Sequence, residues 1–490
     1  MRLMIRNEQR DRSPLILLGL SLLGLGIYVL IVLRFPIETY IRVPRSNIGS
    51  LTRRSPSIAF LMACAGITLY GSYVAAILLC WRSSASTTLR RMVWVYGLAS
   101  GAVLILVWPI TSTDIFDYIF RGRMASHYGA NPYIVLPNMF KTDPLFAYLG
   151  WPNAPSAYGP LWELLSARMA AIGDTSIWTN VLLHKGLALA TFLVCGLVIA
   201  RLARDVGPQA ELVGSALWLL SPLAIWEITA IGHNDGLLIL SMLLAIWAVS
   251  EDRYGWATAA LVVGGLLKFL PLILLPLVAI HGLRHYPSWP ARLRLVATMA
   301  AISIGLIVLA YVPYWEGPLT LRNITLREKF LNAAPLSVVT YTLSQQWHID
   351  SVRPIISRLG SALLATGIAW QMWHIWSERR DLRTAFFGLL TWYLIVASQW
   401  FQPWYVLWLL ALLAVRPTRQ AFAWVGVWAF SAQTSYLLQF FVLNWLGWRG
   451  NELRGQLLYL IVIFLPLLIA WSVTHRRTPS PAIEPSLAPS

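Results

Sequence analysis

Long apolar runs recur along the whole chain, and they limit its fold more than any other feature. Many contain about 18 or more residues, which is enough to cross roughly 30 Å of hydrocarbon as a helix. Of the 490 residues, 57% are hydrophobic and only 12% are charged. Because backbone groups inside lipid must bond internally, we expect an all-α, polytopic transmembrane helical bundle with about 12–14 membrane segments.

Loop charge predicts how this bundle is oriented. The chain has 38 Lys and Arg against 21 Asp and Glu, a net charge of +17. In a membrane protein such an excess marks cytoplasmic loops and anionic headgroups, so nucleic-acid binding is not expected. If the basic N-terminus lies in the cytoplasm, the loops with Arg82, Arg201 and Arg416 also fall inside. The loop from Arg34 to Arg54 is the exception, because it is basic yet falls outside. Asp114 then falls outside. We expect a multi-pass protein of the cytoplasmic membrane.

The apolar run 256–280 is interrupted by Gly265, Lys268 and Pro271. A single straight crossing would put Lys268 near the middle of the bilayer and would export the basic loop that follows. Two half-helices that return to the cytoplasm avoid both problems. Irregular backbone at membrane depth is tolerated only where it is buried in protein or lines a cavity. We therefore predict a broken hairpin that points toward a site, although discontinuous helices are also typical of transporters.

Unusual polar side chains gather on the predicted external side. They are Asp114, Asp117, Arg121, Arg123, Tyr158, Glu163, His184, Lys185, Glu227, His233, Asn234, Asp235, Lys268, Gln399 and Gln402. Ionisable groups at the membrane edge are functional candidates by default. Their gathering on one side predicts a cavity that opens outward and holds carboxylates and cations together.

The external polar stretch, roughly 111–180, is the longest in the chain, and a carboxylate pair lies near its start. If residues 113–123 are helical, Asp114, Asp117 and Arg121 fall at i, i+3 and i+7 on one stripe. They would then place a general base beside a phosphate-binding cation. The alternative is a solvated helix on the membrane surface, in which Arg121 only pairs with Asp117.

The motif Gly232-His-Asn-Asp235 ends one predicted helix and begins another. Its side chains suit the hydroxyl groups of a sugar, or a weak metal site with Asp114. Asp235 could instead be a helix N-cap.

Two further features are unusual in apolar surroundings. Lys268 needs an anionic partner inside its apolar run. We expect a lipid phosphate in that role, with Asp235 or Glu227 as the structural alternative. Gln402-Pro-Trp-Tyr405 places an amide and two aromatic rings at an external helix start. Aromatic faces suit sugar rings, but residues of a membrane-interface belt look the same.

The chain contains no Walker A motif and no dinucleotide fingerprint. A transferase built this way must take its activated group from a donor in the membrane, such as a polyprenyl phosphate sugar. Asp114 could deprotonate an acceptor hydroxyl. Lys268 and Arg121, or a divalent ion such as Mg²⁺ or Mn²⁺, could stabilise the departing phosphate. A secondary transporter or lipid flippase is the alternative function; a non-catalytic scaffold would leave the polar cluster unexplained.

Several motifs together resemble a known family. The segment Asp114-Ile-Phe-Asp-Tyr-Ile-Phe-Arg-Gly-Arg123, followed by Gly-Ala-Asn-Pro-Tyr133 and Tyr-Gly-Pro-Leu-Trp162, resembles the large first external loop of GT-C glycosyltransferases. It is most similar to the bacterial polyprenol-phosphate-mannose-dependent α-(1→6)-mannosyltransferases. The motifs that end at Asp235, Pro271 and Tyr405 fall where that family carries similar ones. The resemblance covers about residues 90–415.

The resemblance implies an inverting, integral-membrane hexosyltransferase with a lipid or glycan acceptor and an extracytoplasmic active site. Its catalytic aspartate maps onto Asp114, with Asp117 as the second candidate. We expect the donor phosphate to be bound by Lys268, Arg121 and Arg123. We expect sugar or acceptor contacts from His233, Asn234, Asp235, Tyr158, Glu163, Gln402, Trp404 and Tyr405.

These predictions divide the chain into four parts. A basic cytoplasmic N-terminus occupies residues 1–13. A GT-C-like catalytic module at 14–415 includes an external loop, 111–180, with short amphipathic helices. C-terminal transmembrane helices follow at 416–475, and a Pro- and Ser-rich cytoplasmic tail at 476–490 is expected to be disordered.

Overall fold

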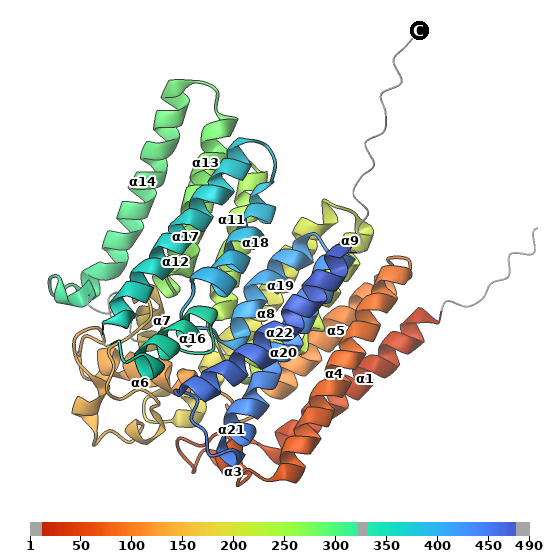
Figure 1. Cartoon of the computed structure of the whole chain (residues 1–490), viewed down its shortest axis with the longest axis vertical. Coiled ribbons are helices and arrows are strands. Elements are labelled where there is room, and N and C mark those ends of the chain that lie inside the picture. Colours follow the sequence, from red (N-terminus) through yellow and green to blue (C-terminus); the bar gives the residue numbers. More distant parts are fainter. Residues whose placement is uncertain (1–11, 322–330, 350, 477–490) are drawn as a thin grey trace, which may run out of the picture.

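The computed structural model describes residues 12–321, 331–349 and 351–476 (Figure 1). The regular elements of these residues are helices, accompanied by three isolated β-bridges. The predicted all-α, polytopic helical fold is therefore confirmed. The predicted N-terminal segment and the tail lie almost wholly outside the described residues, so their structure stays a prediction.

The first part of the chain runs as far as the end of the broken hairpin. Its helices are α1 (Ser13–Arg34), α2 (Ile37–Tyr40), α3 (Ile48–Leu51), α4 (Pro56–Arg82), α5 (Thr87–Leu104), α6 (Asp114–His127), η1 (Pro137–Phe140), η2 (Phe146–Tyr148), α7 (Pro160–Gly173), α8 (Ile177–Arg204), α9 (Pro208–Leu219), α10 (Pro222–Ala224), η3 (Ile225–Ala230), α11 (Asp235–Ser250), α12 (Tyr254–Leu267), η4 (Leu270–Leu274) and α13 (Leu275–His285).

The second part begins with a long helix on one flank. Its helices are α14 (Trp289–Tyr311), η5 (Val312–Tyr314), η6 (Leu319–Leu321), α16 (Pro335–Tyr341), η8 (Thr342–Gln346), α17 (Val352–Trp376), α18 (Leu382–Trp392), η9 (Tyr393–Ala397), η10 (Pro403–Tyr405), α19 (Val406–Val415), α20 (Arg419–Leu437), η11 (Leu438–Val442), α21 (Leu443–Trp445) and α22 (Leu453–Arg476). The elements η3, η8, η9 and η11 are short π-helical turns.

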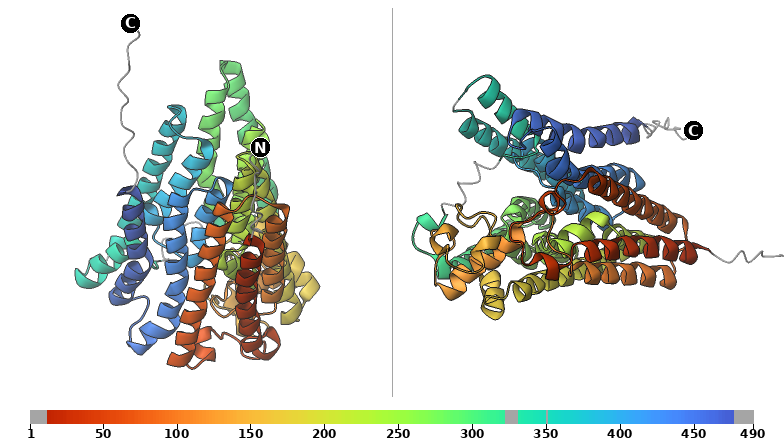
Figure 2. Two further views of the ribbon diagram at one scale, coloured as in Figure 1. Left: turned by 90° about the vertical axis from the view of Figure 1, so that its right-hand side faces the viewer. Right: turned by 90° about the horizontal axis from the view of Figure 1, so that it is seen from below.

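Five described helices are long and apolar enough to cross a membrane: α1, α4, α8, α14 and α22. A sixth crossing is formed if α9 and the following segment, bent by 45°, count as one span. Shorter apolar helices, among them α11, α12 and α19, lie between them. The long helices run side by side, and the C-terminal helices form one flank of the bundle (Figure 2). The chain is thus a multi-pass membrane protein.

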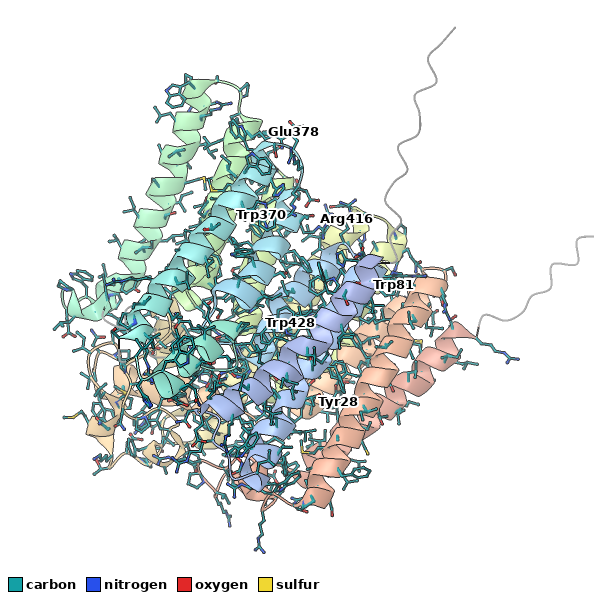
Figure 3. The ribbon with its side chains drawn as sticks, in the orientation of Figure 1. Tyr28, Trp81, Trp370, Glu378, Arg416 and Trp428 are labelled. Atoms are coloured by element: carbon teal, nitrogen blue, oxygen red, sulfur yellow. The ribbon has the colours of Figure 1, made fainter. Side chains whose placement is uncertain are left out.

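Several ion pairs between loop residues lie at one end of the bundle, which we call the basic end. There Arg201 pairs with Glu251 at 3.9 Å and Arg284 pairs with Glu378 at 2.5 Å. Further pairs at this end are Arg90–Glu211, Arg204–Glu211 and Arg416–Asp381. Glu378 and Arg416 are labelled there in Figure 3. The opposite end, with α3, α6 and α21 (Figure 1), is called the site end.

The interrupted run 256–280 folds as the predicted hairpin of two half-helices. α12 descends to Lys268, and η4 with α13 returns to the basic end. The hydroxyl of Tyr254, where α12 begins, lies 3.0 Å from Nδ1 of His281 in α13. Asp252 and His285 are 3.5 Å apart. Lys268, in extended backbone geometry, therefore lies at the tip of the hairpin, on the site end.

The predicted helix at the start of the polar stretch is present as α6, which packs against α7. It is not the solvated surface helix that was the alternative, because the residues from Ile115 to Met124 are all buried. A Cβ added at Gly122 would collide with the backbone of Ser166, so glycine permits the close approach of the two helices. The external polar stretch is therefore a packed layer over the site end.

Candidate active site

Asp114 begins α6 and is held by groups from two other segments. The hydroxyl of Tyr158 donates a hydrogen bond to its Oδ2 at 3.3 Å. Nε2 of His233 lies 4.0 Å from the same oxygen. The side chain is 22% exposed, so the carboxylate remains accessible. Burial raises the pKa of Asp114, and the positive charge of Lys268 opposes that rise.

Lys268 forms an ion pair with Asp235, with 2.7 Å between Nζ and Oδ2. The other oxygen of Asp235 accepts a hydrogen bond from Nε1 of Trp408 at 3.0 Å. Nζ of Lys268 also lies 5.4 Å from the centre of the Tyr405 ring. Asp235 is therefore the protein partner of Lys268, one of the two structural alternatives, and it is the first residue of α11 rather than its N-cap.

His233 lies between two carboxylates. Its Nδ1 atom is 3.1 Å from Oε2 of Glu227, a residue of the π-helical turn η3. Its ring stacks on Trp404, with 3.8 Å between ring centres and 29° between the planes. Gly232 just before it has a φ of +84°, a geometry that favours glycine. These contacts fix the imidazole ring beside Asp114.

Asn234 is buried, and neither polar atom of its side chain has a hydrogen-bond partner among the described residues. It lines a small cavity with room for about one water molecule. His184 and Trp162 line the same cavity, and Nε2 of His184 and Nε1 of Trp162 also lack partners there. Such buried, unpaired groups are costly unless a water or ligand bonds them.

Asp117 and Arg121 hold the loop that follows α6. Asp117 accepts hydrogen bonds from the backbone amides of Trp151, at 3.0 Å, and Gly150, at 3.3 Å. Arg121 lies 3.7 Å from Asp117 and donates to the carbonyl of Ala154 at 3.0 Å. Burial raises the pKa of Asp117 to about 7, against the opposing charge of Arg121. Arg121 therefore pairs with Asp117, as the alternative interpretation expected, although in a buried helix and not in a solvated one.

Arg123 and Glu163 are likewise bonded to the external layer. Arg123 is paired with Asp143 at 2.6 Å and with Asp174 at 2.7 Å. Glu163 is buried and accepts a hydrogen bond from the hydroxyl of Ser156. Burial raises the pKa of Glu163 to about 7. Among the contacts of the described residues, neither side chain meets Asp114 or Lys268.

The motif Gln402-Pro-Trp-Tyr405 reaches the same cluster. Trp404 is buried against His233, and Tyr405 stacks on Trp408 with 4.3 Å between ring centres. Gln402 precedes η10 and is half-buried. A membrane-interface belt would leave both rings at the lipid surface, whereas Trp404 packs on His233 and Tyr405 lies beside Lys268.

Sequence reasoning missed Trp408 and Tyr436. Trp408 bonds Asp235, and the hydroxyl of Tyr436 donates to Glu227 at 3.2 Å. Nothing in the sequence distinguishes Trp408 among 25 tryptophans. Tyr118 was also missed: its ring packs against Tyr158 with 5.0 Å between centres. Its position four residues after Asp114, on the same helix face, is a signal that could have found it.

The site combines a carboxylate, an ammonium group and aromatic faces at one end of a helical membrane bundle. Residues 26–284 match the family model described as "Alpha-(1->6)-mannopyranosyltransferase, N-terminal domain". The chain belongs to this family of glycosyltransferases, as its motifs predict. The matched residues include Asp114, His233 and Lys268.

Similar proteins carry the same kind of name. Alpha-(1->6)-mannopyranosyltransferase A of Corynebacterium glutamicum is 22% identical over 403 residues, which cover 76% of this chain and 78% of the relative. Alpha-(1->6)-mannopyranosyltransferase B of the same organism is 23% identical over 388 residues, covering 72% and 63%. GPI mannosyltransferase 1 of Aspergillus fumigatus is 29% identical over 199 residues, covering 40% of each chain.

Proposed function

We propose that this glycosyltransferase moves a mannose residue from a polyprenyl phosphate mannose to a hydroxyl group of a lipid-linked or glycan acceptor. The names of its relatives support mannose as the sugar. The lack of nucleotide-binding motifs in the sequence supports a donor that is already in the membrane. The observation that carries the proposal is the accessible carboxylate of Asp114 beside the charge of Lys268.

In this mechanism Asp114 is the general base. Its carboxylate takes the proton of the acceptor hydroxyl while the hydroxyl oxygen bonds to C1 of the mannose. The bond between C1 and the phosphate oxygen breaks, and its electron pair leaves with the polyprenyl phosphate. Attack from the face opposite the phosphate inverts the configuration at C1. The hydrogen bond from Tyr158 orients the carboxylate, and His233 lies beside it.

Lys268 stabilises the departing phosphate. It is 17% exposed and lies at the tip of the hairpin, where Asp235 and Tyr405 hold it in position. A cation placed where negative charge develops lowers the barrier to the reaction. Arg121 and Arg123 were expected to share this role. We assign them instead to the external loop, because they pair with Asp117, Asp143 and Asp174 and, among the described residues, neither contacts Asp114 or Lys268.

A divalent ion was the alternative source of positive charge. Among the described residues no three His, Cys, Asp or Glu side chains come together as metal ligands. Asp235, one of the expected ligands, already pairs with Lys268. We therefore assign no catalytic step to a metal ion. Activity that is lost on chelation and restored by Mg²⁺ or Mn²⁺ would show that a metal ion takes part.

We infer that the active site faces the extracytoplasmic side of the cytoplasmic membrane. The loops with Arg82, Arg201 and Arg416 lie at the opposite end, and such loops favour the cytoplasm. The basic loop from Arg34 to Arg54, at the site end, is the exception. To test this orientation, Asn153, an exposed residue of the external loop that contacts Asn138, is replaced by a single cysteine, which is then labelled. Access to a membrane-impermeant reagent from outside intact cells supports it, and access only after lysis contradicts it.

The reaction itself can be tested with purified protein in lipid nanodiscs. Radiolabelled polyprenyl phosphate mannose, glucose and pentose donors are each incubated with a membrane lipid extract. We expect label from the mannose donor in a covalent product, and none with Asp114→Asn. The returning hairpin of α12 and α13 also suits a transporter. Movement of the donor lipid across proteoliposomes without covalent product would favour that function.

A further inference from the structure

A second, larger cavity lies on the site end, away from Asp114. Its volume is about 470 Å³, within the range of roughly 300–1,000 Å³ that is usual for ligand sites. It is formed by residues 331–332, Trp400, the π-helical turn η11, α21 and the start of α22. All of these lie beyond residues 26–284, which match the family model.

The lining of this cavity has the chemistry of a neutral, hydroxyl-rich ligand. Side-chain amides come from Asn332, Gln439 and Asn444, and an amide can both donate to and accept from a hydroxyl group. Trp400 and Trp448 add aromatic faces, on which the C–H groups of a sugar ring can pack. Arg449 is the one charged residue among the described residues that line the cavity. A phosphate or an acidic ligand would call for more positive charge.

The wall of the cavity is held by internal hydrogen bonds. Gln456 is fully buried, and its Oε1 accepts from the backbone amide of Ala333 at 2.8 Å and from Ser337 at 2.9 Å. Its Nε2 donates to the carbonyl of Gly450 at 2.5 Å. Gln456 thus ties residues 333–337 to the start of α22. These hydrogen bonds therefore fix the shape of this wall of the cavity.

The same segments connect this cavity to the catalytic cluster. Trp400 lines the cavity, while Trp404, four residues later, stacks on His233. Four extended residues span at most about 14 Å. On the other side, Gln439 of the cavity follows Tyr436, which bonds Glu227 beside His233. A ligand longer than one sugar could therefore reach from this cavity to the cluster around His233.

We propose that this cavity is a subsite for the acceptor glycan. It holds sugar units of a neutral hexose chain at some distance from the hydroxyl that attacks the donor. This inference rests on the proposed mannosyltransferase function, because it names the part of that enzyme that binds the acceptor. The enzyme should then use a chain of several mannose residues better than a single mannoside.

The kinetic test compares a synthetic mannoside with an α-(1→6)-linked mannotetraoside as acceptors. We expect Gln439→Ala and Trp448→Ala each to raise KM for the tetraoside roughly tenfold, with KM for the donor unchanged. Trp347→Ala is the matched control, since Trp347 is exposed and does not line the cavity. A tetraoside KM equal to wild type in both variants would overturn the inference, as would a change confined to the donor KM.

A binding test separates this inference from the proposed reaction. In the Asp114→Asn background, titration with free mannotetraose is followed by intrinsic tryptophan fluorescence. We expect saturable binding that Trp448→Ala weakens and Trp347→Ala does not. Wild-type protein that binds the tetraose but transfers no sugar would contradict the proposed function alone. Wild-type protein that transfers sugar but shows no saturable binding, or binding unaffected by Trp448→Ala, would contradict the subsite alone.

Discussion

Nζ of Lys268 lies 2.7 Å from Oδ2 of Asp235, and Nε1 of Trp408 donates to the other oxygen of that carboxylate. The pair joins the tip of the α12–α13 hairpin to the first residue of α11. It therefore positions the ammonium group at the site end without a lipid ligand.

Breaking this pair should destabilise the protein. Lys268→Met leaves the fully buried Asp235 carboxylate without its counter-charge, and removing one partner of a buried pair costs about 3–5 kcal/mol. Lys268→Met with Asp235→Asn should recover much of the lost stability, because no buried charge remains unpaired. Thermal unfolding in detergent measures both variants.

Activity should not follow stability in these variants. The double variant is expected to fold yet to transfer no mannose, since it lacks the cation that we propose for the departing phosphate. Lys268→Arg keeps the charge and serves as the control. An active double variant would show that Lys268 only supports the fold.

The acid side of the pH profile should report Asp114. Burial raises the pKa of this carboxylate and Lys268 lowers it, so the base is protonated, and kcat/KM falls, as the pH drops through that raised value. Tyr158→Phe removes a hydrogen bond that lowers the pKa of Asp114, and should move the acid limb to higher pH. The profile of kcat/KM for each protein measures the shift; a shift to lower pH would contradict the assignment.

Asp117→Asn distinguishes the two candidate bases. Asp117 is bonded to the amides of Gly150 and Trp151, so its loss should loosen the external loop and lower stability by about 1–3 kcal/mol. We expect kcat to fall less than about tenfold, because the carboxylate of Asp114 is untouched. Steady-state kinetics and thermal unfolding together show whether Asp114 or Asp117 is the base. Loss of all turnover with unchanged stability would make Asp117 the base.

Trp404→Ala tests how His233 is positioned. The stack of 3.8 Å holds the imidazole near Asp114, and a small misplacement of a catalytic group can cost about 100-fold in rate. We expect kcat to fall by roughly that factor, with Trp404→Phe recovering much of it. If both variants instead raise only the acceptor KM, the ring binds sugar and does not position His233.

Much of the fold was predictable because it depends on features of the sequence itself, namely the lengths of apolar runs and the positions of charged, glycine and proline residues. The lengths of the apolar runs and the charges of the loops predict that Asp114 and Lys268 lie on the same side of the membrane. Gly265 and Pro271 predict the broken hairpin. The pairing of polar groups was less predictable. That Arg123 meets Asp143 and Asp174, and not the donor site, depends on how the external loop 111–180 folds back.

The residues that contact Asp235 and His233 could not be predicted from the sequence either. Trp408 lies in a wholly apolar helix, α19, and only packing brings it to Asp235. Glu227 was noted as a candidate partner of Lys268, but the π-helical turn directs it to His233. Spacing along a regular helix does not predict such a turn.

The central claim is that Asp114 takes the proton of the acceptor hydroxyl. Its most direct test is the rate of mannose transfer by Asp114→Asn, measured together with equilibrium binding of polyprenyl phosphate mannose. We expect turnover to fall by at least about 1,000-fold, while donor affinity stays close to that of wild type. Turnover within tenfold of wild type, in a variant that still binds the donor, would contradict the account.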